Sequence, residues 1–314
     1  MRSTKNSNLL AIGHAFIELQ SVDSTNNYAM AQASKGRAAH GTLFFAHEQW
    51  AGKGQRGRSW TSTPGENIVL SAVLEPLALQ PSQAFSLSVC VALACHDLFS
   101  RYAGPGSTSI KWPNDLYWND RKAGGILIEN HFQGDRWPLA IAGMGININQ
   151  VEFSATARNP VSLRQITGRT FQAAELAREL GSCLDQRYSA LIGTAIATAS
   201  GIPTSTSATA SDNPTTTTAT TSDNPVSTTA TASGNPTSGN AGTAISKNIA
   251  AQLQEYNSLL YRQGQTVRLK KDNAVFETVI QGVSAHGQLL TRDVMDREFN
   301  FGEVEWLIPE SLRL

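Results

Sequence analysis

Cysteine is scarce in this sequence, and the three that occur are Cys90, Cys95 and Cys183. An odd number of widely spaced cysteines is typical of neither a disulfide framework nor a zinc site. Because Cys90 and Cys95 lie within an apolar run with a helical pattern, we expect them to be small buried hydrophobic residues. Neither kind of scaffold is therefore expected to hold this fold together.

An excess of charge of one sign is also missing. The 25 basic and 25 acidic residues give a formal net charge of +0, which argues against a global attraction to nucleic acid or to a membrane. No apolar run is long enough to suggest a membrane span. The run after Arg2 and Lys5 is broken by Gly13 and His14, which makes a poor signal peptide. We expect a cytoplasmic protein that binds neither DNA nor membranes.

Charged residues make up only 16% of the chain, and one long uncharged tract, residues 194–246, explains the deficit. Pro203, Pro214, Pro225 and Pro236 recur there every eleven residues, between stretches rich in Thr, Ser, Ala and Asn. Such a tract cannot bury enough apolar surface to offset its chain entropy, and a proline in each repeat breaks a helix. We predict a low-complexity insertion that is disordered and tolerated at the surface.

The sequence on either side of this insertion indicates two domains, as the length of the chain also suggests. Residues 1–193 alternate between extended apolar runs and helical patterns, which favours an α/β domain. One of these patterns, residues 81–103, predicts a buried helix that begins after a proline. Residues 247–314 predict a connecting helix followed by four or five short strands of a small barrel.

A glycine-rich loop, "AGKGQRGRSW", begins at Ala51 and spells G-x-G-x-x-G. A dinucleotide-binding fingerprint needs a helix that opens at the last glycine, but turn formers and another strand follow here. A Walker A loop is excluded because Gly-Lys-Ser/Thr is missing. Lys53, Arg56 and Arg58 are suited to bind phosphate, and Trp60 could stack on a base. A solvated basic loop remains the alternative on this motif alone.

A second cluster, "IKWPNDLYWNDRKAGGILIEN", places Lys111, Asp115 and Lys122 around two tight turns between short strands. Small residues follow Lys122 and leave room for a ligand beside its ammonium group. Two lysines and a carboxylate on neighbouring strands suit the activation of an acid by a nucleotide, because cations offset the charges of carboxylate and phosphate. Ordinary hairpin charges are the alternative for each residue taken singly.

Taken together, "DSTN", "EQWAGKGQRGRSW", "KWPNDLYWNDRKAGGILIE" and "GMGININ" resemble the biotin protein ligases in both order and spacing. The resemblance covers about residues 10–193 and 247–314. It implies an α/β (α+β) fold, in which a mixed-sheet catalytic domain precedes a small SH3-like β-barrel. Only a short segment precedes the first expected strand, so we expect the monofunctional type without an N-terminal DNA-binding domain.

The resemblance also implies roles for individual residues. Together with the second cluster, which contributes Lys111 and Asp115, we expect the catalytic positions to be Lys53, Lys111, Asp115 and Lys122. The biotin-binding positions are Ser24, Thr25, Asn26, Gln49, Lys53, Gly54, Gln55, Lys122 and Gly125. The ATP-binding positions are Arg56, Arg58, Trp60 and Asn147. Ser24 and Thr25 are also candidate N-cap residues, and Asn147 is alternatively a turn residue. No metal ligands are assigned.

The implied reaction uses biotin and ATP as substrates, with Mg²⁺. Biotinyl-AMP forms first, and a lysine of a biotin carboxyl carrier protein then receives the biotinyl group. A lipoate or octanoate ligase of the same fold, and a non-catalytic biotin-binding protein, remain as alternatives. Lys53 stands where the family usually has arginine, and Gln55 is neutral where some members have arginine, which puts retention of the intermediate in question. We expect a monomer or a weak homodimer.

Overall fold

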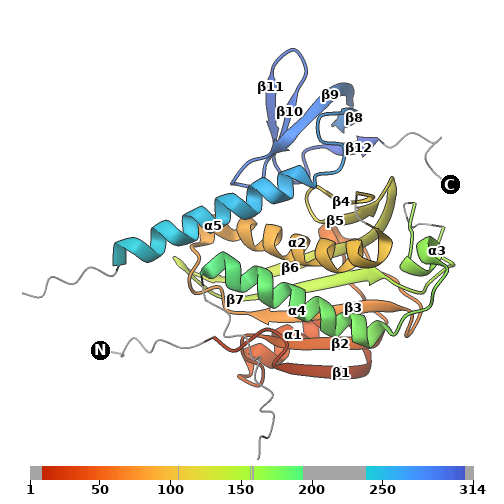
Figure 1. Cartoon of the computed structure of the whole chain (residues 1–314), viewed down its shortest axis with the longest axis vertical. Helices are drawn as coiled ribbons and strands as arrows, with labels where there is room; N and C mark the ends of the chain where they lie inside the picture. Colours follow the sequence, from red (N-terminus) through yellow and green to blue (C-terminus); the bar gives the residue numbers. More distant parts are fainter. Residues whose placement is uncertain (1–8, 105, 156, 158, 194–237, 308–314) are drawn as a thin grey trace, which may run out of the picture.

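The computed structural model describes residues 9–104, 106–155, 157, 159–193 and 238–307, and Figure 1 shows how they are arranged. A large sheet with helices on both faces forms the first part of the molecule. A long helix then leads to a smaller β domain. The predicted disorder of the insertion falls on residues 194–237, which lie outside the described residues.

Seven strands form the large sheet, in the spatial order β1-β2-β3-β7-β6-β5-β4. The strands are β1 (Ala15–Val22), β2 (Thr42–Gln49), β3 (Asn67–Leu74), β4 (Thr108–Lys111), β5 (Asp115–Trp118), β6 (Arg121–Gln133) and β7 (Arg136–Asn147). β1 pairs with β2 in parallel and all the other neighbours pair in antiparallel fashion. The predicted mixed sheet is therefore confirmed.

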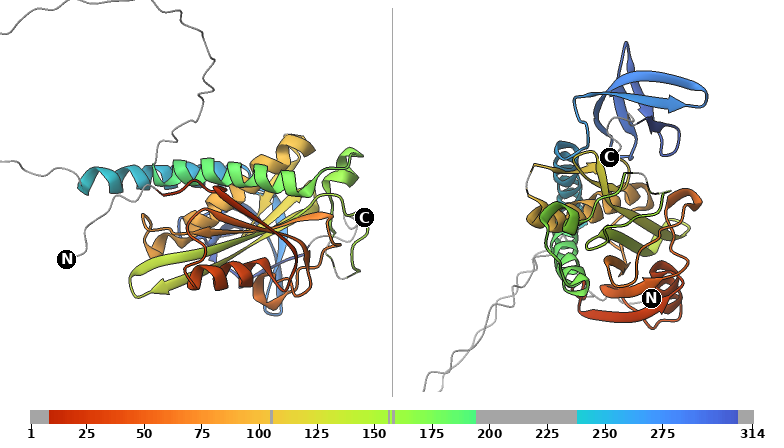
Figure 2. Two further views of the ribbon diagram at one scale, coloured as in Figure 1. Left: turned by 90° about the horizontal axis from the view of Figure 1, so that it is seen from below. Right: turned by 90° about the vertical axis from the view of Figure 1, so that its right-hand side faces the viewer.

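The alternation of side chains along β2 separates two hydrophobic layers. Phe44 points to the face covered by α1 (Thr25–Ser34), where it packs with Ala29 and Ile141. Leu43 and Phe45 point to the opposite face, which is covered by α2 (Ala84–Ala103) and α4 (Ala173–Ile192). Figure 2 shows α1 and α4 on opposite sides of the sheet. A short helix, α3 (Leu163–Thr167), lies between β7 and α4.

The α2 helix corrects the expectation that no apolar run is long enough to suggest a membrane span. Together with the 3-10 turn η2 (Pro81–Gln83), it is long and apolar enough to cross a membrane by length and composition, with a mean hydropathy of 1.3 over one window. Packing explains this apolarity, because 61% of that window is buried inside the protein. Cys90 and Cys95 lie buried in this helix as free thiols, as predicted, and burial raises the pKa of both.

The second part begins with α5 (Ser238–Ser258), which starts inside the range assigned to the insertion from the sequence. Five strands follow, in the spatial order β11-β10-β9-β8-β12, and all pairs are antiparallel. They are β8 (Thr266–Lys271), β9 (Ala274–Val283), β10 (Leu289–Arg292), β11 (Asp296–Phe299) and β12 (Glu305–Leu307). This is the predicted small C-terminal β domain.

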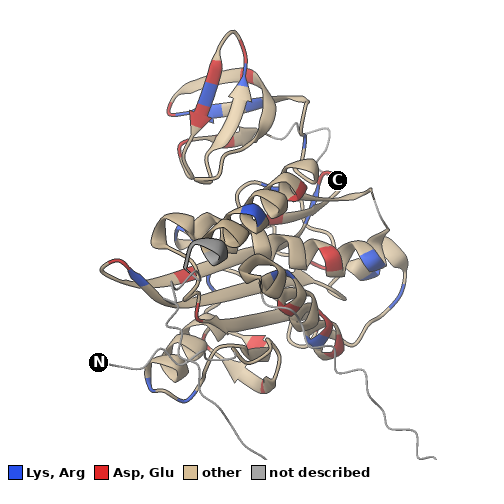
Figure 3. Ribbon diagram, turned by 60° about the vertical axis from the view of Figure 1, so that its left-hand side comes forward, with Lys and Arg blue, Asp and Glu red and all other residues tan. Residues whose placement is uncertain are grey.

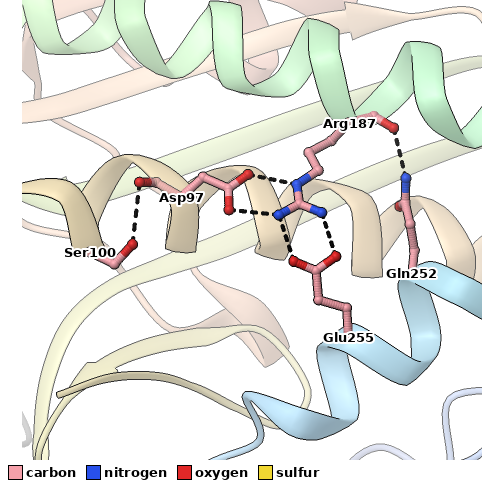
Figure 4. Close-up of polar contacts among 5 residues, drawn as sticks. All are labelled: Asp97, Ser100, Arg187, Gln252 and Glu255. Carbon is pink, nitrogen blue, oxygen red and sulfur yellow. Dashed lines mark hydrogen bonds and ion pairs between the residues drawn. The ribbon is translucent and has the colours of Figure 1, made fainter. Parts of the chain in front are cut away.

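A charge cluster holds α5 against the first domain. Arg187 of α4 forms a double hydrogen bond with Asp97 of α2 at 2.6 and 2.7 Å, and another with Glu255 of α5 at 2.6 and 2.7 Å (Figure 4). Gln252 also donates to the Arg187 carbonyl at 2.8 Å. Elsewhere, charges of both signs are spread over both domains, in keeping with the balanced composition (Figure 3).

Candidate active site

A cleft of about 490 Å³, which includes its open mouth, lies between the start of α1, the glycine-rich loop and strands β6 and β7. The lining residues are Ser24, Thr25, Asn26, Gln49, Lys53, Gly54, Gln55, Trp60, Val69, Leu70, Asn114, Asp115, Lys122, Gly125, Ile126, Leu127, Gly143, Met144 and Gly145. The structure thus brings together every residue that the resemblance assigned to biotin.

One end of the cleft is polar because α1 begins there. Ser24 occupies the N-cap position, but its side chain forms no capping hydrogen bond, so its hydroxyl is free to face the cleft. The Thr25 backbone nitrogen donates to Gln49 Oε1 at 2.8 Å, and the Thr25 hydroxyl oxygen lies 3.2 Å from the same Oε1 atom. Both N-cap candidates therefore line the cleft, and the Ser24 hydroxyl does not cap the helix.

Asn26 is buried beneath the same end of the cleft. Its Nδ2 donates to Glu129 Oε2 at 2.8 Å and to the Leu127 carbonyl at 3.2 Å. Its Oδ1 accepts from the Ser71 hydroxyl, whose oxygen is 2.6 Å away. The side chain is therefore held by three partners on two strands, β3 and β6.

The other end of the cleft carries an ion pair. Lys122 Nζ lies 2.7 Å from Asp115 Oδ1, and the two side chains are 29% and 21% exposed. A Cβ atom at Gly125 would lie 3.5 Å from this ammonium nitrogen and 3.6 Å from the carboxylate oxygen. Because glycine adds no side chain there, the pair stays open to a ligand carrying its own carboxylate or phosphate.

The glycine-rich loop lines the cleft as a tight hairpin rather than as the start of a helix. The Gly54 nitrogen donates to the Arg58 carbonyl at 2.7 Å, and only the short turn η1 (Gln55–Gly57) lies between them. Lys53 Nζ donates to Asn27 Oδ1 at 2.5 Å. The absence of a helix at this point confirms that the loop is not a dinucleotide-binding fingerprint.

Trp60 closes one wall of the cleft. Its ring lies so near Gly145 of β7 that a Cβ atom there would come within 2.6 Å of it. Its indole Nε1 is buried and has no hydrogen-bond partner among the described residues. A buried indole N–H usually finds an acceptor, so this unpaired group is an exception among the described residues.

Four predicted residues lie outside the lining. Lys111 Nζ lies 5.4 Å from the centre of the Tyr117 ring of β5 and 5.1 Å from that of Trp306, which belongs to β12 of the small β domain. Arg56 donates to the Gly302 carbonyl of the same domain at 3.3 Å. Arg58 is exposed in the loop.

The fourth of these residues, Asn147, ends strand β7 and is buried. Its Nδ2 donates to the carbonyl of Lys122 at 3.3 Å and to that of Val161 at 3.1 Å. It therefore fixes the backbone on which Lys122 is carried, rather than being the turn residue considered from the sequence.

Several lining residues were missed from the sequence. Asn114 donates from Nδ2 to the Ile126 carbonyl at 2.7 Å, and Met144 contributes to the floor. Gly143 and Gly145 let α1 and Trp60 approach β7 closely. All four lie inside the quoted motifs, so their position within "KWPND" and "GMGININ" was the available signal.

The electrostatics around the cleft depend on paired groups rather than on a metal cluster. Among the described residues, no group of three or more His, Cys, Asp or Glu side chains could hold a metal ion. Just outside the lining, a hydrogen bond from Asn27 lowers the pKa of the Asp23 carboxyl. This carboxylate accepts from Asn27 Nδ2 at 2.6 Å and so orients the amide that holds Lys53.

The sequence of this chain is similar to those of known proteins. Residues 18–147 match the biotin/lipoate A/B protein ligase family. The chain is 34% identical over 178 residues to the bifunctional ligase/repressor BirA of Escherichia coli, covering 55% of this chain and 54% of that protein. It is 36% identical over 166 residues to the biotin--[acetyl-CoA-carboxylase] ligase of Paracoccus denitrificans, covering 50% and 66%. The chain thus spans about half the length of the first of these relatives.

The fold comparison covers more of the chain. The biotin protein ligase of Aquifex aeolicus, solved in complex with biotin and ATP, superposes with a TM-score of 0.63 over 94% of this chain and 99% of that one. Their sequence identity is 20%, so this likeness concerns the fold, including the small C-terminal β domain. Residues 18–147 of the chain therefore form a domain of the biotin/lipoate A/B protein ligase family.

Proposed function

We propose that this protein activates biotin with ATP and transfers it to a lysine of a carrier protein. The observation that carries the proposal is the arrangement of one cleft. A hydrogen-bonding end at Ser24, Thr25 and Gln49 suits the ureido head group. The open Lys122–Asp115 pair at the other end suits the carboxylate, and the glycine-rich loop lies between the two.

In the first step, a carboxylate oxygen of biotin attacks the α-phosphorus of ATP, and the bond to pyrophosphate breaks. Lys122 and Lys53 act by position and charge, because ammonium groups offset the charge that gathers as carboxylate and phosphate approach. Mg²⁺ would arrive with the nucleotide phosphates.

In the second step, the amine of the acceptor lysine attacks the carbonyl carbon of biotinyl-AMP, and AMP leaves. Asp115 accepts from Lys122 at 2.7 Å, and in this proposal its carboxylate takes the proton that the amine loses. A covalent enzyme intermediate is not required. Gly54 and Gln55 cover the mixed anhydride, and Gln55 is tied to the Ile126 carbonyl at 3.3 Å, which keeps water from the intermediate.

The nucleotide would lie along the Trp60 side of the cleft. The Trp60 ring, which lines the cleft, offers a flat face for a base, and Arg58 on the same loop offers a cation for the phosphates. Asn147 and Lys111 support this site indirectly in our proposal, the first through the Lys122 backbone and the second through the small β domain. Arg56 likewise reaches that domain.

The acceptor would be the carrier protein of acetyl-CoA carboxylase or of a related biotin-dependent carboxylase. Two relatives bear the name biotin--[acetyl-CoA-carboxylase] ligase, which supports this choice. We further propose that the protein acts in the cytoplasm, as a monomer or weak homodimer, without binding DNA or membranes.

Pyrophosphate release in the presence of ATP and Mg²⁺, with biotin or lipoate as the acid, tests the proposal. We expect release with biotin only. Release with lipoate only would favour the lipoate branch of the family. Binding of biotin without release in any condition would favour a non-catalytic biotin-binding protein.

A further inference from the structure

Glu129 lies beside the cleft but not in its lining. It is carried by β6, two residues beyond Leu127, and its side chain is 35% exposed. One carboxylate oxygen accepts from Asn26 at 2.8 Å, and the other lies 3.7 Å from Lys53 Nζ. The residue thus contacts both the start of α1 and the glycine-rich loop.

We infer that Glu129 is a positioning residue. It determines which groups donate and which accept hydrogen bonds at the end of the cleft formed by Thr25, Asn26 and Gln49, where the biotin head group would bind. The inference rests on the proposed function, since it assumes that biotin occupies this cleft. Glu129 itself touches no substrate in this scheme. It acts through Asn26, which lines the cleft, and to a smaller degree through Lys53.

The orientation of the Asn26 amide follows from two neighbouring groups that can only accept hydrogen bonds, the Glu129 carboxylate and the Leu127 carbonyl. An ionised carboxylate and a backbone carbonyl both lack a proton to donate. Because Glu129 and the Leu127 carbonyl both face the Asn26 amide, its NH₂ group must point to β6 and its oxygen to Ser71. A flipped amide would place its oxygen against these two acceptors and turn its NH₂ group toward Ser71.

The fixed amide orders the hydroxyls beyond it. Ser71 has one proton, and its oxygen is 2.6 Å from Asn26 Oδ1 and 2.7 Å from Thr25 Oγ1. Since the amide oxygen can only accept, Ser71 donates to it, and Thr25 uses its own proton for Ser71 or for Gln49 Oε1. Gln49 Oε1 also accepts from the Thr25 nitrogen, so its NH₂ group remains for the ligand.

The contact with Lys53 is the smaller part of the effect. The two side chains are 45% and 35% exposed, and exposed ion pairs contribute little. Lys53 is also held by Asn27, at 2.5 Å. Loss of the acceptor for a buried Asn26 donor should therefore cost more than loss of the charge.

Two substitutions separate these parts. Glu129→Gln keeps an oxygen that can accept from Asn26 but removes the charge, whereas Glu129→Leu removes both. Calorimetric titration of the full chain with biotin should show a Kd raised about tenfold for Glu129→Leu and at most about threefold for Glu129→Gln. Glu179→Leu is the matched control, because Glu179 is 31% exposed in an ion pair with Arg101 on the other side of the sheet.

A double-mutant cycle with Asn26→Ala tests whether the effect passes through that amide. We expect Glu129→Leu to cost little further affinity once Asn26 is replaced. An equal loss in both backgrounds, or wild-type affinity in Glu129→Leu, would overturn the inference alone. Failure of the wild type to bind biotin would instead overturn the proposed function. Thermal unfolding checks each variant, and Glu129→Ala replaces the leucine variant in the cycle if that one does not fold.

Discussion

Replacing Arg187 with methionine should loosen the junction between the two domains more than any exposed charge substitution. The guanidinium makes two double hydrogen bonds, one to Asp97 and one to Glu255, all between 2.6 and 2.7 Å. Such paired, planar contacts are the strongest kind of charged hydrogen bond. Methionine keeps much of the packing volume but leaves two neighbouring carboxylates without their shared cation.

The expected loss follows from the partial burial of the cluster. Breaking a fully buried ion pair costs about 3–5 kcal/mol. Arg187, Asp97 and Glu255 are 20%, 25% and 42% exposed, so solvent screening reduces the expected loss to about 2–3 kcal/mol. Arg101→Met, which removes an exposed pair with Glu179, should cost no more than about 1 kcal/mol.

The assay is equilibrium unfolding in urea for the wild type and the two variants, at several pH values. The hydrogen bond from Arg187 lowers the pKa of Glu255 below its usual value. Stabilisation from a carboxyl with a depressed pKa is present above its unfolded pKa of about 4.3 and is lost as the pH falls through the folded value. The difference between wild type and Arg187→Met should therefore be full near pH 7 and shrink in acid. Equal stability of Arg187→Met and Arg101→Met at pH 7 would refute the reasoning.

Three further substitutions give distinct readouts. Burial lowers the pKa of His40 to about 4, so about 2–3 kcal/mol of stability should disappear as the pH falls from about 6.5 to 4, and His40→Asn should flatten this slope in a urea titration. Gly145→Ala should weaken biotin-dependent pyrophosphate release at least about tenfold, because the new methyl group displaces the Trp60 ring. Lys111→Met should lower stability by about 1 kcal/mol in thermal unfolding, through the lost cation–π contacts. A loss of pyrophosphate release as severe as that of Lys122→Ala would show that Lys111 acts directly.

Much of the fold could be predicted because its signals are local. The extended apolar run around Phe44 and the N-cap candidates Ser24 and Thr25 at the start of α1 depend on neighbouring residues only. The helix α2 was also found as a buried element, although its composition alone would suit a membrane. That distinction depends on packing against the sheet, which no local pattern reports.

Site residues were predicted where they lie within contiguous motifs. They were missed where tertiary contacts decide which side chains reach the cleft. Lys111 and Asp115 are paired across one hairpin, yet only Asp115 reaches the cleft. The register shift between Leu116 and Tyr117 breaks the strict alternation that would assign faces from sequence. Glu129 is 103 residues from Asn26 in the chain, so their hydrogen bond could not be inferred from spacing.

Transfer of biotin to a carrier domain tests the central claim most directly. The full chain, with biotin, ATP and Mg²⁺, is incubated with a biotin carboxyl carrier domain, and the intact mass of the carrier is measured. We predict a gain of one biotinyl group on the carrier lysine with the wild type, and little or none with Lys122→Ala, which removes the cation at the carboxylate end of the cleft. An unmodified carrier with the wild type, or equal modification by both proteins, would contradict the account.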